Sequence, residues 1–570
     1  MKPTTSLLTA CMLALCLLPA GRAQGSDAND IELLKAKLAE QQKQIEMLRQ
    51  SVEAQQKLIE RLTAPAAKPA EQATQASAPA AAQPAAQAPG FPRAGGAVAS
   101  ATGALPDLSP VTPSPKYPAA DAQPAAQTSY PTQLQLGNIT IMPVGFMDAT
   151  AVWRNENTGS IIGSNFGSVP FSNAVPGGKL DEFRFSPQNS RLGFRVDGDW
   201  KGFRFIGYNE FDFLGTSGSN AIGVTNGAFV PRLRLYWVDV QKAGWEILGG
   251  QSWSMLTPNR KGISPLPGDI FYSQVMDVNY MLGLTWTRQP GFRILYHAPQ
   301  DKATFGIAFE NPNQYIGGSG GGPQITLPTA LSGLAGSQLD NTSTGYLSTP
   351  NQMPDIIAKV AFDPSSRVHF EVAGIAREFK IFNSTTGQPT SGQTFSKTGG
   401  GGSINANVEV FKNFRLITNN FVSDGGGRYI FGQAPDLVVH ADGSLSLIHA
   451  SSMVQGFETN VTKKTMLWAY FGYLWIGRNM ALDANGTSKI GYGYLGAPNS
   501  QNHMEREYTF GMTQTLWKDA KYGAISMIGQ YEYLTRNPWY IALGALDHAS
   551  DSTIYFDLRY TLPGGVPAMK

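Results

Sequence analysis

Ser552-Thr-Ile-Tyr-Phe-Asp-Leu-Arg-Tyr-Thr-Leu562 is the stretch of this chain that decides its fold. Apolar and polar side chains alternate along it residue by residue, as on a strand with two different faces. One face carries Ile554, Phe556, Leu558, Tyr560 and Leu562, and the other carries Tyr555, Asp557, Arg559 and Thr561. An apolar face toward lipid and a polar face toward water are typical of a transmembrane β-barrel.

The same alternation recurs upstream, for example in Arg191–Val196 and Ser403–Val410. The connections between such segments alternate between short and long, as periplasmic turns and external loops do in bacterial barrels. Short connections are expected near 198–202, 242–244, 299–302, 363–366, 412–413, 463–464 and 518–521. Long ones are expected near 155–189, 215–228, 257–287, 311–353, 381–399, 425–449, 477–503 and 536–550.

The strand count depends on Tyr280–Trp286, which looks strand-like by itself. Bacterial single-chain barrels have an even number of strands, so we assign this stretch to a long loop and start the next strand at Arg288. The expected fold is an all-β transmembrane barrel of about 16 antiparallel strands, preceded by an α-helical coiled coil. A barrel of that size leaves an aqueous channel.

Composition and targeting agree with a barrel. The 570 residues include only 15% charged residues and carry a formal net charge of +2, which gives no indication of a nucleic-acid partner. Residues 1–23 read as a secretory signal peptide, and both cysteines, Cys11 and Cys16, lie within it. The mature chain is therefore expected to have no thiol chemistry.

Residues 31–63 read as a coiled-coil oligomerisation segment, because a strict heptad is buried only when helices wrap around one another. The alternative is an amphipathic helix packed on its own domain. The seam is formed by Ile31, Leu34, Leu38, Ile45, Leu48, Val52, Ile59 and Leu62. An Ala/Pro/Gln-rich disordered linker is expected over 64–136, the barrel over 137–562 and a tail over 563–570.

Tryptophans near the predicted segment ends suggest two aromatic girdles at the membrane interfaces. Trp200, Trp245 and Trp517 lie beside short turns, and Trp153, Trp253 and Trp475 lie where strands approach long loops.

The long loop over 257–277 is the first candidate for setting the properties of a pore. It is stiffened by prolines and carries Arg260, Lys261 and Asp269. If it folds into the lumen, these charges face the solute, and diameter and field set selectivity. An exposed external loop fits the sequence equally well.

A second candidate is a set of arginines on the predicted lumen face. These are Arg191, Arg195, Arg204, Arg232, Arg234, Arg288 and Arg293. They form either a basic ladder that attracts anions or, with inward Glu210, Asp212, His369 and Glu371, an ionic network that stiffens the wall.

Enzymatic activity is not expected, because the few histidines show no Ser/His/Asp arrangement. His369 and Glu371 share one strand face but read as lumen residues rather than metal ligands, and no metal or other cofactor is expected.

Several short motifs resemble the DcaP-like trimeric outer-membrane porins. They are Gly145–Ala151, Ser190–Phe194, Arg232–Tyr236, Gly250–Trp253 and Arg288-Gln-Pro290, in a chain ordered as signal, coiled coil, linker and barrel. The resemblance implies a trimer of water-filled barrels, a periplasmic N-terminal coiled coil and passive uptake of small, often anionic, organic solutes. The tail after Leu562 departs from the terminal aromatic residue that such porins usually present to the insertion machinery.

The sequence therefore predicts an outer-membrane porin for small hydrophilic solutes, with outer-membrane lipid and further copies of the chain as partners. Two alternatives stay open: a specific sugar or phosphate channel, and a structural tether whose N-terminal segment grips the cell wall.

Overall fold

The computed structural model describes residues 133–171, 177–215, 222–223, 226–227, 229–271, 273–318, 322–339, 351–385 and 388–563. All of them belong to one compact unit, Phe91–Lys570. The predicted signal peptide, the coiled coil and nearly all of the linker lie outside the described residues and stay predictions.

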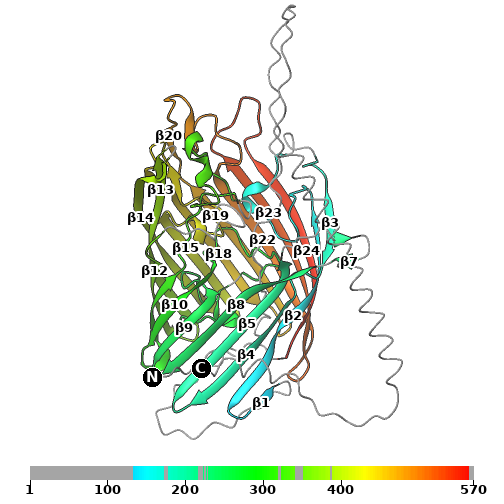
Figure 1. Ribbon diagram of the computed structural model, residues 1–570. Coiled ribbons are helices and arrows are strands. Elements are labelled where there is room, and N and C mark those ends of the chain that lie inside the picture. Colours follow the sequence, from blue (N-terminus) through cyan, green and yellow to red (C-terminus); the bar gives the residue numbers. More distant parts are fainter. Residues whose placement is uncertain are drawn as a thin grey trace, which may run out of the picture. The chain divides into compact units, whose positions relative to one another are not determined.

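The described residues form a closed antiparallel β-barrel (Figure 1). Its large sheet has 18 strands. Two of them, β1 (Leu134–Leu136) and β3 (Glu182–Ser186), are short additions beside the first long strand, which leaves 16 in the wall. The wall strands are β2 (Ile139–Arg154), β4 (Arg191–Trp200), β5 (Phe203–Gly215), β8 (Val230–Lys242), β9 (Trp245–Trp253), β10 (Arg288–His297), β11 (Ala303–Glu310), β12 (Asp355–Ser365), β13 (Val368–Thr385), β14 (Gln388–Phe411), β15 (Phe414–Asp424), β18 (His449–Asn460), β19 (Thr465–Ile476), β22 (Asn502–Asp519), β23 (Gly523–Pro538) and β24 (Ala549–Thr561). The ring closes where β2 pairs with β24, so the wall has no open edge.

The connections contain only short elements. The short strands are β6 (Ile222–Gly223), β7 (Asn226–Gly227), β16 (Leu437–Val439), β17 (Leu445–Leu447), β20 (Asn479–Leu482) and β21 (Lys489–Tyr492). The 3-10 helices are η1 (Phe166–Ser168), η2 (Pro267–Asp269), η3 (Pro299–Asp301), η4 (Thr329–Leu334) and η6 (Gly427–Tyr429). No helix among the described residues is long and apolar enough to cross a membrane.

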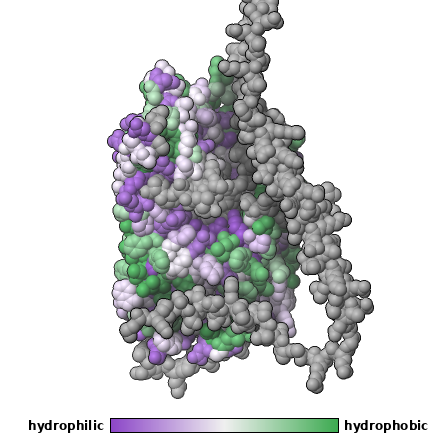
Figure 2. All heavy atoms as spheres, viewed as in Figure 1, coloured by the Kyte–Doolittle hydropathy of each residue, from purple (hydrophilic) through white to green (hydrophobic). Residues whose placement is uncertain are grey.

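Strand β24 shows why this sequence closes into a barrel. Tyr555, Asp557 and Arg559 are buried on the inner face, whereas Ile554 and Phe556 are exposed on the outer face. The alternation predicted from the sequence is confirmed along this strand. Hydrophobic residues gather across the lower part of the barrel on the face shown in Figure 2, with hydrophilic residues above them.

The two ends of the barrel differ. The short turns gather at the lower end in Figure 1, and the long connections gather at the upper end, near β20. All seven predicted short turns fall between successive strands. The parity argument is also confirmed, because Tyr280–Trp286 belongs to a loop and β10 begins at Arg288.

Two boundary predictions were wrong. Residues 134–136, expected in the linker, form β1 and pair with β2. Of residues 381–399, expected as a long loop, 381–385 extend β13 and 388–399 belong to β14, and Ile381 pairs with Phe395. The many Gly, Ser and Thr residues of that stretch resemble a loop, but cross-strand pairing keeps it extended.

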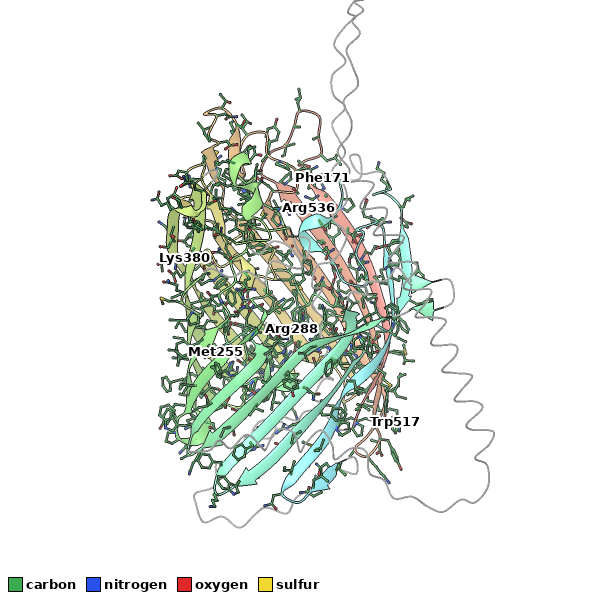
Figure 3. The ribbon with its side chains drawn as sticks, viewed as in Figure 1. Phe171, Met255, Arg288, Lys380, Trp517 and Arg536 are labelled. Carbon is green, nitrogen blue, oxygen red and sulfur yellow. The ribbon has the colours of Figure 1, made fainter. Side chains whose placement is uncertain are left out.

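The tryptophan pattern is only partly as predicted. Trp200, Trp245 and Trp517 are 59%, 55% and 41% exposed beside short turns, as a lower girdle requires. Trp517 marks this lower end in Figure 3. Trp253 was wrongly assigned to the upper girdle, because its side chain is buried in the lumen and only 1% exposed.

Candidate pore constriction

Residues 254–287, which connect β9 to β10, form what we call the constriction loop. Almost all of its side chains are buried, although the loop leaves the wall at the end where connections are long. Burial of a polar loop requires hydrogen-bond partners, and these come from the inner face of the barrel. The sequence left open whether this loop folds into the lumen or lies outside as an exposed loop. The structure places it in the lumen.

The loop contacts the wall on several sides. Near its start, the backbone N–H of Asn259 donates to the Glu371 carboxylate at 2.9 Å. The Lys359 ammonium donates to the backbone carbonyl of Thr257 at 2.9 Å. Farther along, the backbone N–H of Gln274 donates to the Tyr470 hydroxyl at 3.1 Å. These wall residues belong to β13, β12 and β19, so the loop crosses the interior.

Its second half reaches the far wall and returns. The Tyr555 hydroxyl of β24 donates to Asp277 at 3.0 Å, and the Leu282 amide donates to Glu507 of β22 at 2.7 Å. The Thr285 amide then donates to Asn419 of β15 at 3.0 Å. Burial raises the pKa of the Asp277 carboxyl, although its hydrogen bonds act in the opposite direction.

A glycine pair lets the loop lie directly on the wall. Gly283 has φ +84°, and a Cβ there would come within 2.5 Å of the Met453 carbonyl oxygen of β18. A Cβ on Gly472 of β19 would collide with the Leu282 carbonyl oxygen. Backbone packed this closely on backbone has no room for a side chain.

We expect Gly472→Val to displace the constriction loop and to destabilise the barrel by about 1–3 kcal/mol, as overpacking does. A lower midpoint of thermal unfolding and a changed single-channel conductance would report the displacement. Gly529→Val is the matched control, because a Cβ at Gly529 meets no atom within 4 Å. Equal effects of the two substitutions would contradict close packing at Gly472.

Four of the predicted arginines meet beside the constriction loop and form what we call the arginine cluster. Arg191, Arg232, Arg234 and Arg288 surround the carboxylates of Glu210 and Asp212. The Arg234 guanidinium is 2.9 Å from Asp212, and the Arg232 guanidinium is 2.6 Å from the same carboxylate. Four cations against two anions give this cluster a formal charge of +2.

Arg288 differs from the other members of the cluster in that it makes no salt bridge with a carboxylate among the described residues. Its guanidinium lies over the Trp253 ring at 5.7 Å, as that of Arg234 does at 5.5 Å, and its Nη1 is buried without a hydrogen-bond partner among the described residues. Arg288 lies at mid-height inside the barrel (Figure 3). The Arg288 guanidinium therefore keeps one donor available for a further acceptor.

The remaining predicted residues are distributed elsewhere. Arg195 and Arg204 both pair with Asp197, at 2.7 and 3.3 Å. Arg293 lies 4.0 Å from Glu246, and Arg260 lies 2.7 Å from Glu458. Asp269 accepts from the Ser264 hydroxyl at 2.8 Å, and Lys261 lies near Asp301. The seven wall arginines therefore do not form one continuous ladder, and most have carboxylate partners, as the stiffening network requires.

The His369 side chain is also part of an ionic network. Its Nδ1 lies 2.8 Å from Asp363, and its Nε2 lies 3.2 Å from Glu371. The Lys359 ammonium is 2.7 Å from the same Glu371 carboxylate. These contacts fasten β12 to β13 under the constriction loop.

Aromatic rings form a second feature of the constriction that the sequence did not indicate. Trp286 stacks on Phe431 with 4.7 Å between ring centroids, and its edge meets Trp253 at 5.8 Å. Phe431 belongs to the connection between β15 and β18, far from the constriction loop in sequence. A ring in an irregular loop carries no periodic signal, so only the tertiary structure identifies it.

Arg377 was also missed, although strand parity could have found it. It lies on the same face of β13 as His369 and Glu371 and is fully buried. Its guanidinium pairs with Asp355 at 3.0 Å and with Asp436 at 2.9 Å.

No protein-family model matches this chain, and no curated protein matches it. Among solved structures, the outer membrane channel DcaP of Acinetobacter baumannii aligns with a TM-score of 0.52 at 15% identity, covering 75% of this chain and 99% of that chain. The anion-selective porin from Comamonas acidovorans aligns with a TM-score of 0.40 at 10% identity, covering 74% of this chain and 100% of that chain. OmpF of Salmonella typhi aligns with a TM-score of 0.38 at 11% identity, covering 75% and 100% of the two chains.

Neither of the last two scores reaches 0.5, so of these three structures we compare the fold with the DcaP channel. The resemblance to DcaP-like porins predicted from short motifs is confirmed at the level of the fold. This chain has the fold of a 16-stranded outer-membrane channel.

Proposed function

We propose that this protein is an outer-membrane porin through which small hydrophilic solutes diffuse passively, with a preference for organic anions. The observation that carries the proposal is the constriction loop inside a closed barrel with an apolar outer wall. Such a loop leaves a narrow, charged passage, in which diameter and field select the solute.

The arginine cluster supports the anion preference. It carries a formal charge of +2 at the height of the constriction loop, and a permeating anion gains from that field within about a Debye length. The stacked Trp286 and Phe431 rings give the same region an apolar surface suited to the organic part of a solute.

Single-channel recording in planar bilayers tests the proposal. We expect steps of conductance from the purified barrel, and a reversal potential in a KCl gradient whose sign shows that chloride is favoured. Liposome swelling should show that small neutral sugars also enter. A folded barrel that gives no conductance would refute the porin function, and a cation-selective reversal potential would refute only the anion preference.

A channel specific for sugars or phosphate is the second candidate, because both aromatic rings and arginines border the constriction. Saturation of the flux of one solute at low concentration would favour this candidate over passive diffusion.

We further propose that the protein is a trimer in the outer membrane of a Gram-negative cell, with its N-terminal segment in the periplasm. The predicted coiled-coil seam supports self-association. If the chain is instead a cell-wall tether, deletion of residues 31–62 should abolish envelope attachment. For a porin we expect the same deletion to leave the single-channel conductance within about two-fold of wild type, because the lumen lies in the barrel.

A further inference from the structure

The constriction loop is not alone in folding inward. Residues 425–436, which follow β15, are almost all buried and lie against the inner face of β12 and β13. The Tyr429 carbonyl accepts from the Trp286 amide at 2.9 Å, and Ile430 bridges Trp286 in parallel register. The backbone of the 425–436 segment is therefore hydrogen-bonded to the end of the constriction loop.

A buried ionic network holds the 425–436 segment in place. Arg377 of β13 pairs with Asp436 at 2.9 Å and with Asp355 of β12 at 3.0 Å, and it also donates to the Gly425 carbonyl. The Tyr429 hydroxyl donates to Asp355 at 2.9 Å. One guanidinium thus joins two wall strands to both ends of the segment.

A second arginine fastens the segment from the other side. The Arg428 guanidinium donates to the backbone carbonyls of Asn313 and Asn311 at 2.6 and 2.9 Å. The backbone N–H of Arg428 donates to the Asp436 carboxylate at 2.9 Å. Asp355 Oδ1 has no hydrogen-bond partner among the described residues, but the guanidiniums of Arg377 and Arg428, the Tyr429 hydroxyl and the Asp436 carboxylate all do, and such a buried network is rigid. The segment is therefore a fixed part of the lumen.

This rigid support presents Phe431 to the passage. Phe431 has φ 53°, a backbone conformation that is strained for a bulky residue and persists only where surrounding contacts impose it. Its ring stacks on Trp286 and meets the edge of Phe166 at 6.0 Å. Phe431 is half-buried, whereas Trp286 and Phe166 are 3% and 0% exposed.

We infer that the 425–436 segment is a second constriction element, in which Phe431 limits the size of the solute and Arg377 is the positioning residue that holds it there. The Trp286 ring contacts both Phe431 and Trp253, and the Trp253 ring contacts Arg234 of the arginine cluster. The two loops therefore border one passage. This inference rests on the proposed porin function.

Cysteine accessibility tests it directly. We expect Phe431→Cys to react with a sulfonatoethyl methanethiosulfonate and the reaction to lower the single-channel conductance by at least about two-fold, because a bulky anion then occupies the passage. Phe166→Cys is the matched control, since Phe166 is fully buried in the same aromatic group and should not react. Wild type, whose Cys11 and Cys16 lie in the predicted signal peptide, controls for native thiols.

Two substitutions complete the test. Phe431→Ala should raise the conductance by about 1.5- to 2-fold and admit larger neutral sugars, while Phe185→Ala, on the outer face and 76% exposed, should change neither. Arg377→Lys keeps one charge but cannot make all of these contacts, so open-channel noise should increase. If wild type conducts and Phe431→Cys is unreactive or Phe431→Ala leaves the sugar cut-off unchanged, the inference is wrong. If wild type does not conduct, the porin function itself is wrong.

Discussion

Replacing the constriction loop, residues 254–287, by a two-residue Asn-Gly turn is expected to raise the single-channel conductance roughly three-fold or more. The loop crosses the lumen of a 16-stranded barrel that is wide enough for an aqueous channel even with the 425–436 segment in place. The replacement is feasible because β9 and β10 pair up to their ends, with Trp253 opposite Arg288. A two-residue turn therefore joins them as in an ordinary hairpin. Carboxylates that the loop now caps, such as Glu507, would meet water in the widened lumen.

The connection between β23 and β24 provides the control. Residues 541–548 are exposed, Leu543 fully so, and shortening them in the same way should leave the conductance unchanged. Heat-modifiable migration on gels would show that both variants fold. An unaltered conductance in a folded variant without the constriction loop would show that the loop does not obstruct the permeation path.

Arg288→Glu is expected to lower the chloride-to-potassium permeability ratio about five-fold. The substitution changes the formal charge of the arginine cluster from +2 to 0. We assign this change about 0.5 kcal/mol on each permeating ion, unfavourable for chloride and favourable for potassium, and so about 1 kcal/mol on their permeability ratio. Arg288 is the preferred position, because no carboxylate among the described residues makes a salt bridge with it. Its replacement therefore leaves no buried carboxylate without its cation. The reversal potential in a KCl gradient measures the effect.

Asp212→Asn should act in the opposite direction, since it raises the charge of the cluster while keeping an oxygen acceptor for the guanidiniums. Arg367→Glu is a control for charge alone, because Arg367 lies 53% exposed at a turn between β12 and β13. If Arg288→Glu and Arg367→Glu shift the reversal potential equally, the cluster does not set selectivity.

The success of the sequence analysis is best seen in β24 and β10. Side chains alternate between lipid and lumen along most of each strand, so each correctly read segment also predicts most of the residues that face inward. Arg191, Arg234 and Arg293 were placed on the inner face for this reason, and all three are buried there. Arg288 at the start of β10 departs from this rule, because it lies five positions before the buried Arg293. Their roles in selectivity stay predictions, because position on a face does not establish a role in permeation.

Strand alternation could not predict three other features: the position of Trp253, the pairing of the 381–399 region and the partners of the arginines. Trp253 was misplaced because its approach to a long connection resembles a girdle position, although its ring turns into the lumen. Residues 381–399 were read as a loop because their composition is loop-like, and their pairing became visible only with the partner strand in place. Apart from Asp197, which pairs with Arg195 on the same strand, the carboxylate partners of the wall arginines come from neighbouring strands and cannot be read from one segment.

The sequence by itself determined that a polar-inside, apolar-outside barrel forms, because a two-residue period is a local property that each strand repeats. Only the tertiary structure decided what fills that barrel. The constriction loop and the 425–436 segment lie inside because side chains from at least six wall strands form hydrogen bonds with them. Such partners are hundreds of residues apart in the chain, and their meeting depends on the closed wall.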